Sequence, residues 1–340
     1  MKEQSIFLGA NGYHGFFSLY DEYIDALQLR RLYVLKGGAG CGKSTLMRRI
    51  GELAGAAGDT VITVLCSGDP DSLDGVVLPE RGVALFDGTA PHVLEPKLVG
   101  QQGFYLDLSR FYTSPAPDLS AWDRGCREHY RKAYLFLSAA GSVEALERLS
   151  GEAETAIRRR ASALAERNLK RRSGAGKGSV TRFFTDAFTC RGSLSLPETR
   201  RALAPRLISL PGGGIRGHLF LETLLTLALD RGYDAVVCPD PLAPERIAHL
   251  LLPEAGFGVT TGEGDRRIHL EKLGGFPAEG DKASRRETGQ LRRSLLRKAR
   301  KELSLAKFDH DRLEEAVHPF VDFDAVEEAA GSLARRLLTE

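Results

Sequence analysis

Short apolar runs that end in glycine-rich or polar turns recur along the chain, and each group of runs is followed by a stretch with apolar residues three or four positions apart. Such runs predict buried strands, whereas the spacing of three and four predicts amphipathic helices. In the first half we expect strands near residues 5–9, 32–36, 61–66, 83–86 and 104–108. In the second half we expect them near 182–186, 206–210, 234–238, 257–261 and 267–271. The alternation predicts an α/β fold with mostly parallel sheets and flanking helices.

Two long segments carry the helical spacing, 119–172 and 290–338, and the second is broken near Pro319. A polar, glycine-rich stretch at 171–182 marks the boundary between the halves. At ~150 residues per domain, the chain length suits two modules. The predicted modules are 1–175, with a core at 1–109 and a helical segment at 110–175, and 176–340, with a core at 181–274 and a helical tail at 282–340.

The strongest local motif follows the apolar run at 32–36. A glycine, four further residues and the run Gly42-Lys43-Ser44 satisfy G-x-x-x-x-G-K-[ST], the P-loop pattern. In such a loop, glycines let backbone N–H groups wrap around phosphates, and the following helix start favours anions. We expect Lys43 to reach the β- and γ-phosphates and the Ser44 hydroxyl to reach Mg²⁺. The expected phosphate-binding residues of ATP are Gly37, Gly38, Ala39, Gly40, Cys41, Gly42, Lys43, Ser44 and Thr45.

A second acidic position is expected at the end of a neighbouring strand, where P-loop proteins support the magnesium shell. The apolar run 83–86 ends in Asp87, which we predict to be that metal-linked carboxylate and, with Lys43, part of the catalytic set. The plainer alternative is a turn aspartate, because Asp-Gly is a turn dipeptide. The adjacent glutamate that many ATPases use to position water is missing from the sequence. Thr89 and His92 are further catalytic candidates, against the alternative of a turn threonine and a surface histidine.

The second half repeats the first but has lost its chemical groups. The run RLISLPGGGIRGHL at 206–219 repeats RLYVLKGGAGCGKS at 31–44. His218 and Leu219 stand where the first copy has its lysine and serine, and Thr261 stands at the position of the strand-end aspartate. We predict a duplication whose second P-loop is degenerate and whose repeats pack together as an internal pseudo-dimer.

Composition excludes several classes of protein. With 42% hydrophobic residues, 27% charged residues and a net charge of +2, the chain is neither disordered nor strongly basic. The longest nearly apolar stretch, 219–229, contains Glu222 and is shorter than the ~20 residues of a membrane span, so we expect no membrane segment and no secretory signal. Five cysteines without C-x-x-C spacing are typical of a reduced, cytoplasmic protein. Basic patches at 158–182 and 285–301 are expected to be solvated helix faces, with nucleic-acid or acidic-lipid binding as the less favoured alternative.

Sequence blocks spread over nearly the whole chain carry a family resemblance. They are FLGANGYHGFFSLYD at 7–21, GGAGCGKSTLMRRIG at 37–51, DGTAPHVLEP at 87–96 and AKFDHDRLEEAVHPFVDFDAV at 306–326. With these blocks the chain resembles an uncharacterised bacterial family described only as ATPase or ATP-binding proteins. The resemblance implies tandem P-loop modules with nucleotide-binding residues in both halves. This sequence departs from that pattern in its second module, at His218, Leu219 and Thr261.

The leading hypothesis is an ATP-binding P-loop NTPase that hydrolyses ATP slowly with Mg²⁺ at one site in the first repeat. The second repeat would then be a regulatory or structural pseudo-NTPase. ATP is favoured over GTP because the sequence has no [NT]-K-x-D motif for reading guanine. One alternative is a kinase-like transfer of phosphate to a small acceptor. Another is a non-hydrolysing, nucleotide-gated scaffold whose helical segments bind a protein partner.

Overall fold

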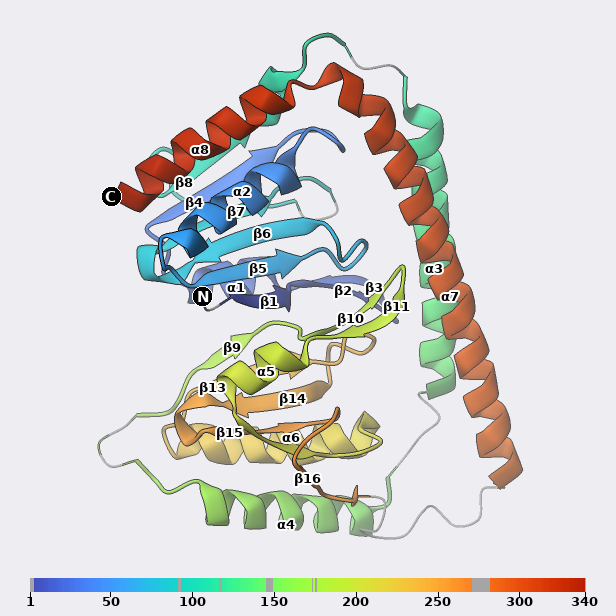
Figure 1. Ribbon diagram of the computed structural model, residues 1–340. Helices are drawn as coiled ribbons and strands as arrows, with labels where there is room; N and C mark the ends of the chain where they lie inside the picture. Colours follow the sequence, from blue (N-terminus) through green and yellow to red (C-terminus); the bar gives the residue numbers. More distant parts are fainter. Residues whose placement is uncertain are drawn as a thin grey trace.

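The computed structural model describes residues 3–90, 93–115, 118–144, 149–172, 174, 176–270 and 282–339. Within them the chain forms two six-stranded mixed sheets flanked by helices (Figure 1). The first sheet has the order β1-β5-β6-β7-β4-β8. Its strands are β1 (Glu3–Phe7), β4 (Arg31–Lys36), β5 (Val61–Leu65), β6 (Leu73–Leu78), β7 (Val83–Asp87) and β8 (Gly103–Asp107).

The second sheet has the order β9-β13-β14-β15-β12-β16, which is the order of the first sheet when strands are matched by their place in each half. Its strands are β9 (Val180–Arg182), β12 (Arg206–Ser209), β13 (Ala235–Pro239), β14 (Ile247–Leu252), β15 (Phe257–Thr260) and β16 (Arg266–Arg267). Most neighbouring strands run parallel. The expected two-module α/β architecture is confirmed.

Each sheet contains an antiparallel strand that the sequence pattern did not predict. In the first sheet β6 lies between β5 and β7, and in the second β14 lies between β13 and β15. Both strands are almost wholly buried, so they lack the polar face that makes a half-buried strand recognisable.

Two hairpins also replace the ends of predicted strands. They are β2 (Gly9–Gly12) with β3 (Gly15–Ser18), and β10 (Asp186–Thr189) with β11 (Gly192–Ser195). The predicted strands 5–9 and 182–186 are therefore wrong at their ends, because β1 stops at Phe7 and β9 stops at Arg182 before the chain enters a hairpin. The predicted strand 267–271 is wrong beyond its first residue, because β16 ends at Arg267 and residues 268–270 are not in a strand; residue 271 lies outside the described residues.

Helices cover the sheets and also form a separate arm. The helices are α1 (Tyr20–Ala26), α2 (Lys43–Ala56), α3 (Ser120–Glu144), α4 (Gly151–Asn168), α5 (Pro197–Leu203), α6 (Gly214–Asp230), α7 (Lys282–Val317) and α8 (Phe323–Thr339), with 3₁₀ turns η1 (Pro79–Arg81), η2 (Leu108–Phe111), η3 (Pro253–Ala255) and η5 (His318–Phe320). α2 packs on β5 and β6, and α6 packs on β13 and β14. α3 and α7 lie side by side as a long arm along one end of both modules (Figure 1). In the part of the chain that the structure describes, no helix combines the length and apolar character that a bilayer crossing requires.

Two of the helices pack on the module opposite to their own half of the sequence. α4, from the first half, lies along α6 of the second module, whereas α8, from the second half, lies along α2 of the first (Figure 1). Ile157 and Ala161 of α4 belong to the core around Phe220. Val326 and Leu333 of α8 belong to the core around Met47. A cut at residue 175 therefore separates each of these helices from the sheet whose core it completes.

The two modules meet where β1 ends and just after β9 ends, through an isolated bridge between Phe7 and Phe184, and they share one hydrophobic core. At the contact, Phe7 N donates to Phe184 O at 2.9 Å, and Phe184 N donates to Phe7 O at 2.8 Å. Beside it, the Asn11 side chain donates to Phe188 O at 2.9 Å. The repeats thus form an internal pair joined by backbone hydrogen bonds and apolar packing.

Candidate functional site

A glycine loop of six residues, Gly37–Gly42, connects β4 to α2. Gly40 and Gly42 have φ angles of 73° and 91°, in the left-handed region that glycine adopts without a steric penalty. The first helical hydrogen bond of α2 is donated by Leu46 N to Gly42 O at 2.9 Å. N–H groups at the start of a helix lack an intrahelical acceptor. Burial raises the pKa of the Cys41 thiol, although the Lys43 N–H group lies beside this thiol and acts to lower that pKa. Thr45 is exposed on this first turn, and Cys41 is fully buried beneath the loop.

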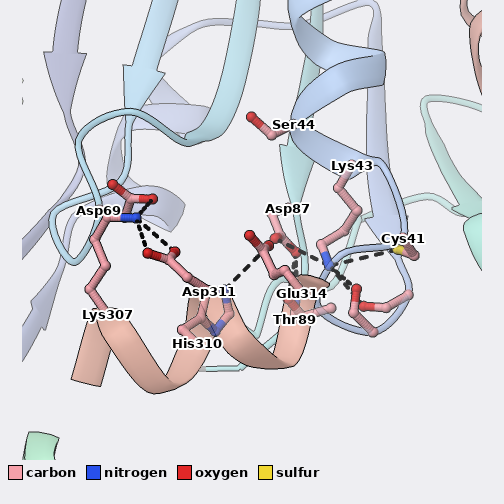
Figure 2. A network of polar contacts seen from close by, with 12 residues as sticks. Cys41, Lys43, Ser44, Asp69, Asp87, Thr89, Lys307, His310, Asp311 and Glu314 are labelled. Carbon is pink, nitrogen blue, oxygen red and sulfur yellow. Dashed lines mark hydrogen bonds and ion pairs between the residues drawn. The ribbon is translucent and has the colours of Figure 1, made fainter. Parts of the chain in front are cut away.

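Lys43 folds back over the loop that precedes it. Its Nζ donates to Gly37 O at 2.9 Å and to Gly38 O at 2.8 Å. The same Nζ lies 3.7 Å from Asp87 Oδ2, and only 10% of the Lys43 side chain is exposed. The permanent cation predicted from the motif is thus held at the loop, together with the predicted carboxylate (Figure 2).

Asp87 reaches this point because β7 pairs in parallel with β4, which places Leu35 and Asp87 opposite one another. Its Oδ1 accepts hydrogen bonds from Thr89 N at 2.8 Å and from Thr89 Oγ1 at 2.7 Å. The structure therefore brings Lys43, Asp87 and Thr89 together, with Thr89 serving as a donor to the carboxylate. His92 lies outside the described residues.

Ser44 points toward a different neighbour. Its Oγ accepts a hydrogen bond from Leu73 N at 3.1 Å, at the start of β6. In Figure 2 no interaction joins Ser44 to Lys43 or Asp87. Among the described residues there is no group of three or more His, Cys, Asp or Glu side chains with the arrangement of a metal site.

The C-terminal segment covers the loop, a feature that the sequence reading did not predict. A Cβ atom placed on Gly40 would lie 3.0 Å from Glu314 Cα of α7, and one placed on Gly42 would lie 3.1 Å from Val326 Cγ1 of α8. The Gly40 N–H group also lies close enough to the Glu314 carboxylate to help lower its pKa. In the sequence, Glu314 lies in the block at 306–326, but nothing in that block indicates which residues Glu314 contacts.

Charged side chains fix α7 in this position. Lys307 Nζ binds Asp69 Oδ2 at 3.0 Å, in the loop before β6, and Asp311 Oδ1 at 2.7 Å on α7 itself (Figure 2). His310 Nε2 lies 3.4 Å from Glu314 Oε1. Hydrogen bonds to Cys126 and to Glu314 raise the pKa of His310 to about 10, so the ring carries a positive charge beside Glu314 at neutral pH.

The second module has lost the later part of the glycine loop as well as the side chains, and Gly212 and Gly213, with φ angles of 84° and 35°, remain as a short turn before the helix. α6 begins at Gly214, and Gly217 N already donates a helical bond to Gly213 O at 2.9 Å. Gly217 occupies the sequence position of Gly42, so the backbone that forms the later part of the loop in the first module is wound into a helix here. His218 Nδ1 accepts from Ile247 N at 3.2 Å, and burial lowers the pKa of His218, which favours the neutral ring.

A pocket of about 260 Å³ lies in the second module and is lined by His218, Arg182 and Arg246 together with Glu222 and Glu245. Its lining has mixed charge, with cations and carboxylates in similar numbers. It therefore lacks the concentrated positive charge and the loop N–H groups that a triphosphate requires.

Comparisons of the chain with models of protein families, with curated proteins and with solved structures found no match. The family resemblance of the sequence stays a resemblance. What the protein does is therefore inferred from the glycine loop and the side chains around it.

Proposed function

We propose that the protein binds ATP with Mg²⁺ at the glycine loop of the first module and hydrolyses it slowly. One observation carries this proposal: a six-residue loop with left-handed glycines connects a central parallel strand to a helix whose first residue is Lys43, beside the strand-end carboxylate of Asp87. Such a loop combines N–H donors, a helix start and a cation within one turn, which is the arrangement that binds phosphate.

Lys43 would be the main partner of the terminal phosphates. Its present acceptors are two neutral carbonyl groups, Gly37 O and Gly38 O. A phosphate oxygen forms a stronger, charge-assisted bond with the ammonium group than a carbonyl does. We therefore expect the Lys43 ammonium group to exchange these carbonyl partners for a phosphate oxygen while remaining near Asp87.

The residues present fit a magnesium ion shared with a nucleotide. Mg²⁺ is commonly held by one or two protein oxygens, phosphate oxygens and water, and Ser44 and Asp87 supply such oxygens at this site. Bound Mg²⁺ would neutralise phosphate charge. The Ser44 hydroxyl would exchange its contact with Leu73 N for the ion, and Asp87 would support the ion's shell.

Slow turnover follows from the side chains near Asp87. The residue after it is Gly88, which offers no carboxylate to orient a water molecule. Thr89 donates its hydroxyl hydrogen to Asp87, and a neutral hydroxyl can accept a hydrogen bond from water but is too weak a base to remove its proton. Lys43 and the loop N–H groups would therefore supply the principal stabilisation of charge that develops during hydrolysis.

A second candidate function is a nucleotide-responsive scaffold, which the contacts of α7 and α8 with Gly40 and Gly42 favour. A ligand in the loop would meet these helices directly. In that case binding alone, without turnover, would change their position. The second module would then be a structural partner in either function, because its loop backbone is helical.

Calorimetric titration with MgATP tests the proposal. Wild-type protein is expected to bind one MgATP per chain, and Lys43→Ala is expected to weaken binding at least tenfold, or about 1.4 kcal/mol. Arg49→Ala, on the exposed face of the same helix, is the matched control and should bind as wild type does. Phosphate release with Mg²⁺ and with a chelator then measures hydrolysis. Two sites per chain, or binding that is unchanged in Lys43→Ala, would refute the proposed site.

A further inference from the structure

The end of α7 lies on the glycine loop, and we propose that Glu314 competes there with the phosphates of a nucleoside triphosphate. In this arrangement the chain's own carboxylate occupies the loop, and a triphosphate binds only after the end of α7 has moved away. The inference rests on the proposed function, because it assigns the regulation of that same site.

The contact between α7 and the loop involves backbone as well as side-chain atoms. A Cβ atom at Gly40 would lie 3.0 Å from Glu314 Cα, 3.1 Å from Glu314 O and 3.3 Å from Glu314 Cβ. A different rotamer of Glu314 would leave the first two distances unchanged. The backbone of α7, and not only the Glu314 side chain, therefore packs against Gly40, so a triphosphate that needs more room beside this residue requires the helix itself to shift.

The charge of Glu314 makes it a direct competitor. Burial acts to raise the pKa of this carboxyl, but its hydrogen bond to His310 and the nearby Gly40 N–H group lower the pKa below its ordinary value. Glu314 is therefore an anion at neutral pH that lies beside a loop N–H group able to bind phosphate. A phosphate placed at the same N–H group would be repelled by this carboxylate, so each anion weakens the binding of the other.

The turn η5 and the start of α8 are tied to the first module by backbone hydrogen bonds. Within η5, Phe320 O accepts from Thr113 N at 2.9 Å, and just after it Asp322 N donates to Phe111 O at 2.9 Å. Buried residues of α8 also belong to the core of the first module. In the proposed movement the end of α7 swings about η5 away from Gly40 and lifts Val317, which is buried in that core, while α8 stays in place.

Movement of α7 would reach the second module. Farther along the arm, Arg292 of α7 binds Glu144 Oε2 of α3 at 2.6 Å, and Arg246 of the second module binds the same carboxylate. Glu144 therefore links α3, α7 and the second module. A nucleotide that displaces Glu314 would move one end of the arm formed by α3 and α7. That movement would change the geometry of the ion pairs of Glu144, so the arm would couple the nucleotide site to the second module.

Calorimetry with MgATP on matched variants tests the competition. Glu314→Gln removes the charge and keeps the shape, and we expect it to bind MgATP at least tenfold more tightly than wild type. Glu314→Ala should act in the same direction. Glu315→Gln, on the exposed neighbouring position of the same helix, is the control and should leave the affinity unchanged.

Hydrogen exchange supplies the second readout. Saturating MgATP is expected to increase amide exchange in residues 310–317 of wild-type protein, and Lys43→Ala should abolish that increase. Equal affinities in wild type, Glu314→Gln and Glu315→Gln would overturn the competition while leaving ATP binding intact. Unchanged exchange at 310–317 with MgATP bound would overturn it as well. An absence of MgATP binding in both wild type and Glu314→Gln would overturn the proposed function and, with it, this inference.

Discussion

Shortening Leu337 to alanine tests whether α8 belongs to the first module in solution. The Leu337 side chain is 3% exposed and lies in the core that also contains Met47 and Ile50 of α2. Leu337→Ala removes three buried carbon atoms, which costs about 2.4 kcal/mol at ~0.8 kcal/mol per carbon. The cavity left behind raises the cost to about 3–5 kcal/mol. That is a large part of the 5–15 kcal/mol by which proteins are typically stable.

Equilibrium unfolding in urea measures the loss, and hydrogen exchange locates it. Amides of α2 should become less protected in Leu337→Ala, because α2 loses the packing of α8. Glu328→Ala, on the exposed face of α8, is the matched control and should change the free energy of unfolding by no more than about 0.5 kcal/mol. A loss below about 1 kcal/mol in Leu337→Ala, or unchanged protection of α2, would refute the exchange of helices between the modules.

Three further predictions concern buried charges and thiols. Asp186→Asn should destabilise the protein by about 3–5 kcal/mol, because it leaves the Arg200 side chain, which is 3% exposed, without its counter-charge. Urea unfolding measures this loss of stability. A loss below about 1 kcal/mol would contradict the prediction. Burial acts to raise the pKa of Asp186, but its hydrogen bond to His249 and the charge of Arg200 hold that pKa well below the usual range. The stability it contributes is therefore present above the unfolded pKa of ~3.9 and lost as pH falls through the lower folded pKa, so acid titrations of wild type and Asp186→Asn should converge at low pH. Burial raises the pKa of the Cys41 thiol, so alkylation followed by mass spectrometry should modify the half-buried Cys126 before Cys41, and equal rates would count against this assignment.

The two strands that escaped prediction share one physical cause. β6 contains Asp74-Gly75, which a sequence reader takes for a turn. In the structure Asp74 is buried and accepts a hydrogen bond from Tyr20 Oη at 2.7 Å, while Gly75 gives room to the ring of Phe86. Both partners come from other elements, so only the folded chain explains why a polar residue and a glycine occupy a buried strand.

β14 repeats this situation with a histidine. His249 is fully buried, and its ring nitrogens pair with Thr260 Oγ1 at 2.7 Å and Asp186 Oδ2 at 2.6 Å. The sequence shows the histidine inside an apolar run, but it does not show which two residues hydrogen-bond its ring nitrogens. Strands without such a residue, such as β4 and β7, were predicted within a residue or two.

The candidate site was predictable where its residues follow one another along the chain. Gly37–Thr45 form a local motif, and Asp87 ends a strand that pairs with β4, so the parallel register brings it to Lys43. Glu314 was not predictable, because its place depends on α7 returning from the arm to the loop. Neither the spacing of residues nor the hydropathy pattern indicates that the end of α7 lies on the loop. That position is set by packing of α7 along α3 and by the ion pair of Lys307 with Asp69.

The contact between Phe7 and Phe184 has the form of an isologous interface. Each residue donates to the other, as equivalent residues do across a two-fold axis. A polypeptide carrying only one module would expose this edge, with its backbone N–H and C=O groups unpaired. Covalent fusion of the two copies keeps the symmetry of the contact but removes the need for identical sequences. One copy can then lose its phosphate loop to a helix while the other keeps it, which a homodimer encoded by one sequence could not do.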